Sequence, residues 1–409
     1  MDLQKNLEKY ATLILTHGIN LKPGECFTVT VQEETLPLAR EITKQAYQMG
    51  AKDVVYIFND DDMTLSRYLY AKDIAFKEMP KFKTAYTESY LKEGYHRISL
   101  VTANPELLKK VDKKRLEQWQ KVVAQASKNS RKYTMQNIVK WNVSAVASPT
   151  WAQAVFPKLS ATNATKKLWE NIFAATRVNL DNPVAAWNEH DKKLKKYVTF
   201  LNKAQFKKLL YKGPGTDLEV GLVKNHIWQG GAGKTKSGVR FFANIPTEEI
   251  FTMPDAYGVN GTIKATKPLV ALGNIIEDFS FTLKGGKIVE YKAKKGEDVL
   301  KTLLSTDEGA LRFGEVALVP HDSPISNTNI LFKNTLFDEN ASCHFAFGDA
   351  YADTVENGDT LTSAQKKKIG MNQSMTHVDF MVGGPELSVI GVAENGKQTP
   401  ILEKGNWAF

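Results

Sequence analysis

Apolar positions in the first part of the chain follow helical spacing, interrupted by short and continuously apolar runs. Residues 2–17 repeat apolar side chains every three to four positions, which predicts a helix ending at Gly18. The runs 26–31 and 53–58 predict strands, and 35–49 between them predicts a helix. A strand covered on both faces has this continuous apolar character, and the strand–helix–strand order is typical of a parallel βαβ unit. The pattern therefore predicts an α/β fold with a parallel sheet.

The pattern changes near residue 200. From about residue 63 to there, the chain reads as mainly helical, with strands expected at 95–101 and 143–147. After residue 212, short alternating runs are separated by glycine-containing turns, which indicates an antiparallel-rich α+β domain. We therefore expect an N-terminal α/β domain over residues 1–200 and a C-terminal domain over residues 201–409 that carries the functional site.

Several charged side chains interrupt these apolar strands of the C-terminal part. His377 and Asp379 are two residues apart, so on a strand they project from one face while Val378 and Phe380 project from the other. A carboxylate in an apolar strand is costly to bury unless it is paired or bound to a metal. The same part of the chain holds further residues of this kind, namely Glu248, Glu249, Glu315, Glu339 and His344. Carboxylates and histidines in this number exceed the needs of one metal ion and indicate a two-metal hydrolase.

Composition and charge argue against several other classes of protein. The formal net charge is +9, but the lysines are dispersed and no arginine-rich stripe with aromatics is present, so we expect no nucleic-acid partner. No apolar run is long enough to span a membrane, and the mixed charges of the N-terminus do not resemble a signal peptide.

The two cysteines, Cys26 and Cys343, predict a reducing cytoplasm rather than a disulfide framework. Cys343 beside His344 could be a thiol nucleophile, although a buried strand residue is favoured. His321 could line a pocket or shape a turn.

Several segments together resemble the aminopeptidase T/aminopeptidase S family of metalloaminopeptidases. They are residues 21–25, 212–218, 244–254, 314–320, 322–326, 334–344, 348–351 and 374–383, which span nearly the whole chain. The resemblance implies a cytoplasmic exopeptidase acting on short peptides, assembled as a homodimer around an enclosed cavity. It also implies a set of metal ligands in the C-terminal domain: Glu249, Glu315, His344, His377 and Asp379, with Glu339 as a further ligand. Tyr351 would lie beside the metals.

The resulting hypothesis is a metalloaminopeptidase with two divalent ions per subunit, zinc foremost and cobalt or magnesium as alternatives. The ions would activate a water molecule, and either Glu315 or Glu339 would accept its proton. Tyr351 would donate a hydrogen bond to the developing oxyanion. Two alternatives stay open: another dinuclear hydrolase acting on an amide or a phosphoester, and a non-catalytic binding protein that uses the basic surface.

Overall fold

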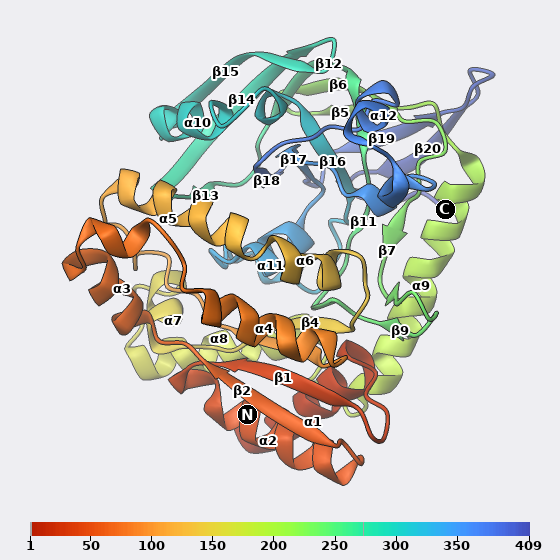
Figure 1. Ribbon diagram of the computed structural model, residues 1–409. Helices are drawn as coiled ribbons and strands as arrows, with labels where there is room; N and C mark the ends of the chain where they lie inside the picture. Colours follow the sequence, from red (N-terminus) through yellow and green to blue (C-terminus); the bar gives the residue numbers. More distant parts are fainter. Residues whose placement is uncertain (1, 273) are drawn as a thin grey trace. The chain divides into compact units, whose positions relative to one another are not determined.

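The computed structural model describes residues 2–272 and 274–409 of the chain, which forms separate compact units (Figure 1). The first unit runs from the N-terminus through His190 and includes Ala232–Pro246, and the second contains Asp191–Gly231 and Thr247–Phe409. The division expected at residue 200 lies within helix α9 (Pro183–Ala204). Among the described residues, no helix is both long and apolar enough to cross a membrane.

A parallel sheet forms the centre of the first unit, with the strand order β10-β4-β3-β1-β2. Its strands are β1 (Cys26–Val31), β2 (Asp53–Phe58), β3 (His96–Val101), β4 (Trp141–Ala145) and β10 (Asn244–Ile245). Phe27 and Val29 of β1 and Ile98 of β3 are buried on one face of the sheet, and Thr28 of β1 is buried on the other. The edge strand β2 is covered less completely, because Tyr56 and Phe58 are exposed. The prediction of a parallel α/β fold is confirmed.

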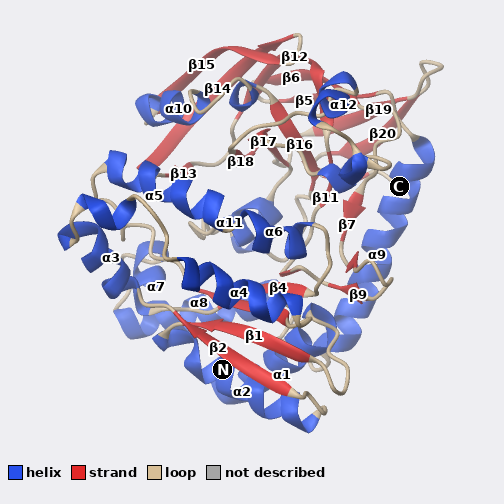
Figure 2. Ribbon diagram, viewed as in Figure 1, coloured by secondary structure: helices blue, strands red, loops and turns tan. Residues whose placement is uncertain are grey.

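Helices connect these strands (Figure 2). They are α1 (Leu3–Leu13), α2 (Leu36–Gln48), α3 (Asp61–Tyr70), α4 (Lys81–Lys92), α5 (Lys113–Ala126), α6 (Lys128–Met135), α7 (Pro149–Val155) and α8 (Ala161–Ala175). The predicted first helix continues past α1 as a π-helical turn that ends at Gly18. The edge strand β10 comes from the later part of the chain, because Ala232–Pro246 returns to the first unit through the hairpin β8 (Gly233–Lys234) and β9 (Arg240–Phe241).

Antiparallel sheets build the second unit, as the alternating pattern predicts. The first has the order β18-β17-β16-β11-β7, with β7 (Gln229–Gly230), β11 (Ile250–Thr252), β16 (Phe313–Leu318), β17 (His344–Gly348) and β18 (His377–Met381). The second has the order β13-β14-β12-β6-β5-β19-β20-β21, and β15 pairs with β14. Its strands are β5 (Lys208–Gly213), β6 (Thr216–Leu222), β12 (Pro254–Lys264), β13 (Leu269–Ala271), β14 (Asn274–Lys284), β15 (Lys287–Lys295), β19 (Ser388–Val392), β20 (Gln398–Glu403) and β21 (Asn406–Trp407). Helix α10 (Glu297–Leu304) packs against this second sheet.

An aromatic core joins the two sheets of the second unit. Phe380 of β18 is fully buried, and its ring centroid lies 5.1 Å from that of Phe281 and 5.8 Å from that of Phe279, both on β14. Phe345 on the adjacent strand β17 and Phe313 on β16 belong to the same cluster. Burying apolar surface in this way is the main driving force for folding. It fixes one face of β16, β17 and β18 toward the core and leaves the other face for polar side chains.

Candidate metal centre

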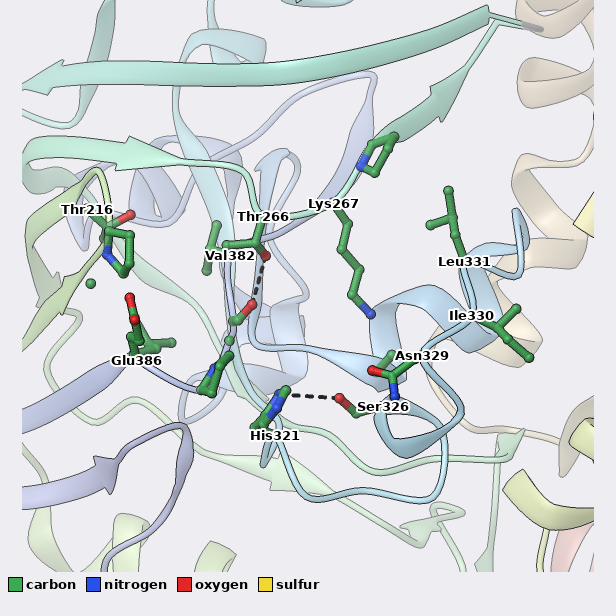
Figure 3. A pocket seen from close by; sticks show the side chains of 18 residues that line it. Thr216, Thr266, Lys267, His321, Ser326, Asn329, Ile330, Leu331, Val382 and Glu386 are labelled. Atoms are coloured by element: carbon green, nitrogen blue, oxygen red, sulfur yellow. Dashed lines mark hydrogen bonds between the residues drawn. The ribbon is translucent and has the colours of Figure 1, made fainter.

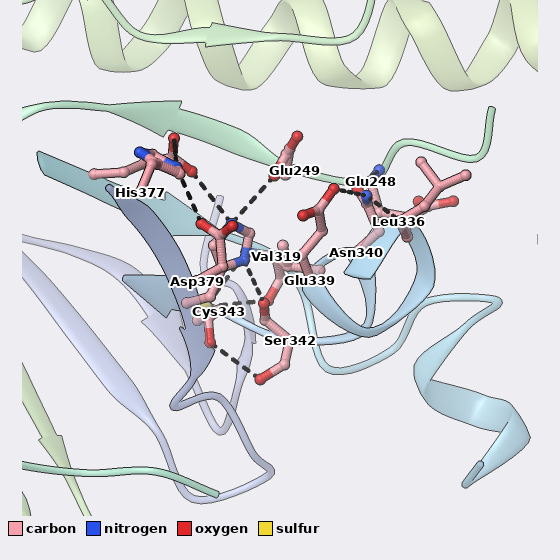
Figure 4. Close-up of polar contacts among 12 residues, drawn as sticks. Glu248, Glu249, Val319, Leu336, Glu339, Asn340, Ser342, Cys343, His377 and Asp379 are labelled. Atoms are coloured by element: carbon pink, nitrogen blue, oxygen red, sulfur yellow. Dashed lines mark hydrogen bonds and ion pairs between the residues drawn. The ribbon is translucent and has the colours of Figure 1, made fainter. Parts of the chain in front are cut away.

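Strand pairing brings the polar side chains of three neighbouring strands together. In register, Ala346 of β17 lies between Glu315 of β16 and Asp379 of β18, while Gly348 is opposite His377. The residues at the middle of this face are small, so the longer acidic and imidazole side chains have room to converge above them. Figure 4 shows His377 and Asp379 of this face, with Glu249 and Glu339 near them.

A β-bulge in β16 gives Glu315 its orientation. The register shifts between Phe313 and Glu315, which are two residues apart and would share one face of a regular strand. Because of the bulge, Phe313 packs in the aromatic core while the Glu315 carboxylate contacts the histidines on the opposite face. Gly314, at the bulge, has no room for a side chain, because an added Cβ would lie 2.3 Å from the carbonyl oxygen of Asp349.

Two groups of possible metal ligands lie among the described residues, and they share Glu315. In the first group, His344 Nε2 is 3.2 Å from Glu249 Oε2 and 3.3 Å from Glu315 Oε1. In the second, His377 Nε2 is 3.3 Å from Asp379 Oδ1 and 3.7 Å from Glu315 Oε2. The two oxygens of Glu315 therefore face different histidines.

Backbone carbonyls orient both imidazoles. His344 Nδ1 lies 3.0 Å from the Ser342 carbonyl oxygen, and His377 Nδ1 lies 2.8 Å from that of Asp349. A carbonyl oxygen only accepts hydrogen bonds, so each Nδ1 carries a proton and Nε2 is the atom directed at the carboxylates. Histidine ligands of metals are commonly held in this way. The ring of Tyr351 packs against the imidazole of His377, with ring centroids 4.9 Å apart and an angle of 55° between the ring planes.

The cluster carries an excess of buried negative charge. Burial raises the pKa of Glu315, and Asp379 adds to this effect against the hydrogen bond from His344. Burial together with the charges of Glu249 and Asp379 raises the pKa of Glu339 well above its ordinary value. For Asp379 the burial effect is outweighed by the hydrogen bond with His377, so its pKa is lowered.

The pKa values of both histidines are raised as well, although burial acts on a histidine in the opposite direction. Burial would lower the pKa of His344, but Glu249 and Glu315 raise it well above its usual range. For His377, Asp379 and Glu315 likewise overcome burial and raise the pKa to about 9. In the absence of a bound cation, the positive charge of the protonated histidines thus compensates the negative charge of the carboxylates. Divalent cations would meet the same electrostatic need, and oxygen and imidazole donors suit zinc and related ions, so the residues fit a metal.

The other residues predicted for the site lie close by. Glu339 is outside both ligand groups, and its Oε1 lies 3.4 Å from Asn340 Nδ2. Glu249 contacts His344, whereas the backbone N–H of Glu248 donates to Asn340 Oδ1. Burial and the cluster's carboxylates, Glu315 first among them, raise the pKa of Tyr351 well above its ordinary value, so its phenol keeps its proton.

Two other candidates stand apart from the ligand groups. Burial raises the pKa of the Cys343 thiol to about 11, and its Sγ donates a hydrogen bond to the Val319 carbonyl. Cys343 is therefore a buried strand-end residue rather than a nucleophile. His321 belongs to neither ligand group and lines a separate pocket.

Sequence reasoning missed two residues that shape this region. Asn340 is fully buried and links Glu248 to Leu336 and Glu339 through its side-chain amide. Phe251 lies beside Tyr351, with ring centroids 6.0 Å apart. An asparagine between a glutamate and an alanine carries no periodic signal, and Phe251 reads as an ordinary strand residue. Only the position of Asn340 directly after Glu339 could have drawn attention to it.

The sheet face and its donor set fit a metal-dependent enzyme, and comparison with known proteins shows the family to which the chain belongs. The chain belongs to the family described as thermophilic metalloprotease (M29), whose model matches residues 3–407. It is 46% identical to Aminopeptidase 2 of Geobacillus stearothermophilus, over 99% of this chain and 98% of the relative. It is 45% identical to Aminopeptidase AmpS of Bacillus subtilis (strain 168), over 99% of both chains.

A solved structure agrees with this assignment. Wild-type AmpT from Thermus thermophilus matches with a TM-score of 0.94 and 39% identity, over 99% of this chain and 100% of that one. The predicted family and the predicted enzyme class, a hydrolase of the metalloaminopeptidase type, are confirmed. The family also implies a divalent metal, in agreement with the ligand groups described above.

Proposed function

We propose that this protein releases N-terminal residues from short peptides with the help of two divalent metal ions, zinc foremost and cobalt or magnesium as alternatives. The observation that carries the proposal is the sharing of Glu315 between the two ligand groups. Glu249, Glu315 and His344 would hold one ion, and Glu315, His377 and Asp379 the other. The relatives named aminopeptidases support the choice of peptide substrates.

Two bound cations would supply a water molecule of lowered pKa and polarise the scissile carbonyl. The protein's own groups then have separable tasks. Both oxygens of Glu315 face histidines, which leaves this carboxylate as a ligand. Glu339 lies outside the ligand groups but within the influence of the same charges. We assign to Glu339 the role of taking the proton from water and passing it to the leaving amine.

Tyr351 would stabilise negative charge on the substrate. Its phenol keeps its proton because of burial and the surrounding carboxylates. A protonated phenol held beside the cluster can donate a hydrogen bond to the oxyanion that develops at the scissile carbonyl. The packing of its ring on His377 and against Phe251 restricts its orientation.

We further propose a homodimer that works in the cytoplasm. The family resemblance supports the assembly, and the free thiols of Cys26 and Cys343 are compatible with a reducing compartment. Light scattering coupled to size exclusion would test the oligomeric state.

The proposed reaction is tested by metal removal and restoration. Protein treated with a chelator should lose release of leucine from leucyl-glycyl-glycine, and added zinc, cobalt or magnesium should restore it. An N-acetylated copy of the peptide should resist cleavage, because an aminopeptidase requires a free amine. A phosphodiester substrate serves as the reaction-class control. Full activity in rigorously metal-free protein, or equal cleavage of the acetylated peptide, would overturn the proposal.

A further inference from the structure

A separate pocket of about 450 Å³ lies in the second unit (Figure 3). This volume is within the range of roughly 300–1,000 Å³ that is usual for small-molecule sites. Its lining includes none of the six proposed ligand and proton-transfer residues of the metal centre. Apolar side chains cover much of the wall, among them Pro268, Ile330, Leu331, Val382 and Leu387.

Lys267 places a cation in this pocket. It is half-buried, and its side chain projects into the cavity in Figure 3. Within the described residues, no hydrogen bond or ion pair joins its ammonium group to another side chain. Burial lowers the pKa of Lys267, and the attraction of Asp338 opposes this only in part. The Asp338 carboxylate accepts backbone N–H bonds from Phe332 and Asn334 instead. A half-buried ammonium without a direct partner favours an anionic ligand.

Glu386 places an anion on the other side of the same pocket. Figure 3 shows Lys267 and Glu386 at opposite ends, with Glu386 beside Thr216. Glu386 is exposed, and its carboxylate likewise has no ion pair or hydrogen bond among the residues that the structure describes. The pocket therefore combines a positive end, a negative end and apolar walls between them. A ligand that matches it has a carboxylate and an ammonium group at its two ends and apolar side chains in the middle.

We infer that this pocket is a second peptide-binding site, which takes a short apolar peptide with its terminal carboxylate at Lys267 and its terminal ammonium at Glu386. Asn329, near the ammonium group of Lys267 in Figure 3, offers a further polar group to the carboxylate. The walls include Ala341, two residues after Glu339, and Val382, three residues after Asp379. An occupant would therefore contact the segments that carry the metal centre without touching its ligands. The inference goes beyond the proposed reaction and holds whether or not two metals bind.

The test is calorimetric titration of the full-length protein with leucyl-leucine in excess chelator, where hydrolysis is stopped. Lys267→Met should weaken binding about 10- to 100-fold, because a charge-assisted hydrogen bond is lost. The matched control is Lys284→Met, which removes the same charge from an exposed position of the same unit outside the pocket. Amidation of the peptide's carboxylate should weaken binding to the wild type but not to Lys267→Met.

The Glu386 end of the pocket is tested by the same calorimetric titration. Glu386→Gln should weaken binding of leucyl-leucine and abolish the preference over its N-acetylated form, whereas Glu403→Gln, at an exposed position outside the pocket, should change neither. Acetylation footprinting by mass spectrometry adds a measurement that needs no variant: leucyl-leucine should slow the modification of Lys267 and not that of Lys284.

Several results would overturn the inference: no binding by the wild type, equal binding by Lys267→Met, or no protection of Lys267. Circular dichroism in chelator verifies that the protein used in these titrations is folded. Because metal is absent throughout, failure here is distinct from failure of the proposed reaction, which is assayed only in metal-loaded protein.

Discussion

Replacing Glu315 by glutamine is the sharpest test of the shared-ligand arrangement. Its two oxygens lie 3.3 Å and 3.7 Å from the Nε2 atoms of His344 and His377. One substitution therefore removes a negative charge from both proposed metal positions. Substitutions at Glu249 or Asp379 remove charge from one position each, because these residues belong to separate ligand groups.

The size of the effect follows from the charge that is lost. Two unit charges about 4 Å apart attract by roughly 4 kcal/mol at the effective dielectric constant of about 20 that suits protein sites. The amide oxygen of glutamine retains part of the interaction, so we expect about half of this or more to be lost at each position. Since about 1.4 kcal/mol corresponds to a tenfold change, each binding step should weaken by about 30- to 1,000-fold.

Zinc titration of chelator-treated protein, in competition with a chromophoric chelator, measures both steps. Wild type should bind two equivalents. Glu315→Gln should weaken both steps, whereas Glu249→Gln and Asp379→Asn should each weaken one. Circular dichroism verifies the fold of each variant. Two wild-type binding steps in Glu315→Gln, or the loss of one step alone, would refute the bridging role.

Four further predictions concern the site and its support. Phe380→Ala should lower the free energy of unfolding by about 3–5 kcal/mol in denaturant titrations with chelator present, because it empties the aromatic core; a loss below about 1 kcal/mol would contradict that packing. Glu339→Gln should reduce kcat by about 10²- to 10⁴-fold with two metals still bound, and loss of metal would instead make Glu339 a ligand. Tyr351→Phe should reduce kcat about 10²-fold with KM little changed, and unchanged kcat would remove the phenol from the mechanism. The pKa of His377 in metal-free protein, about 9, lies above the value of about 6.5 for an unfolded histidine. Its contribution to stability is therefore complete below about pH 6.5 and is lost as the pH rises through about 9, whereas zinc affinity increases over the same interval because fewer protons compete; thermal melts and zinc titrations across this range check both directions.

Much of the fold follows from local patterns. The continuously apolar runs that became β1 and β2 identify a parallel sheet, and the alternating runs identify antiparallel ones. The edge strand β10 could not be assigned in this way. Its two residues pair with β4 only because the chain returns to the first unit, and a pairing this distant in sequence has no local signature.

For the candidate site too, local sequence predicts the position of some residues, whereas others depend on strand pairing. His377 and Asp379 are recognisable from sequence because β18 is regular, so alternation alone places them on one face. Glu315 is recognisable as a charge within an apolar run, but strict alternation would put it on the same face as Phe313. The bulge between these two residues reverses that assignment, and a bulge depends on how neighbouring strands pair.

The sequence by itself thus determined which residues have the chemistry to bind metal, because burying a charge is costly wherever it occurs. The tertiary structure decided that the two oxygens of Glu315 face different histidines and that Glu339 lies outside the ligand groups. It also decided that Lys267 and Glu386, more than a hundred residues apart, line one pocket. Distances between residues on separate strands are set by register, bulges and packing of the whole core, and no single segment of the sequence contains them.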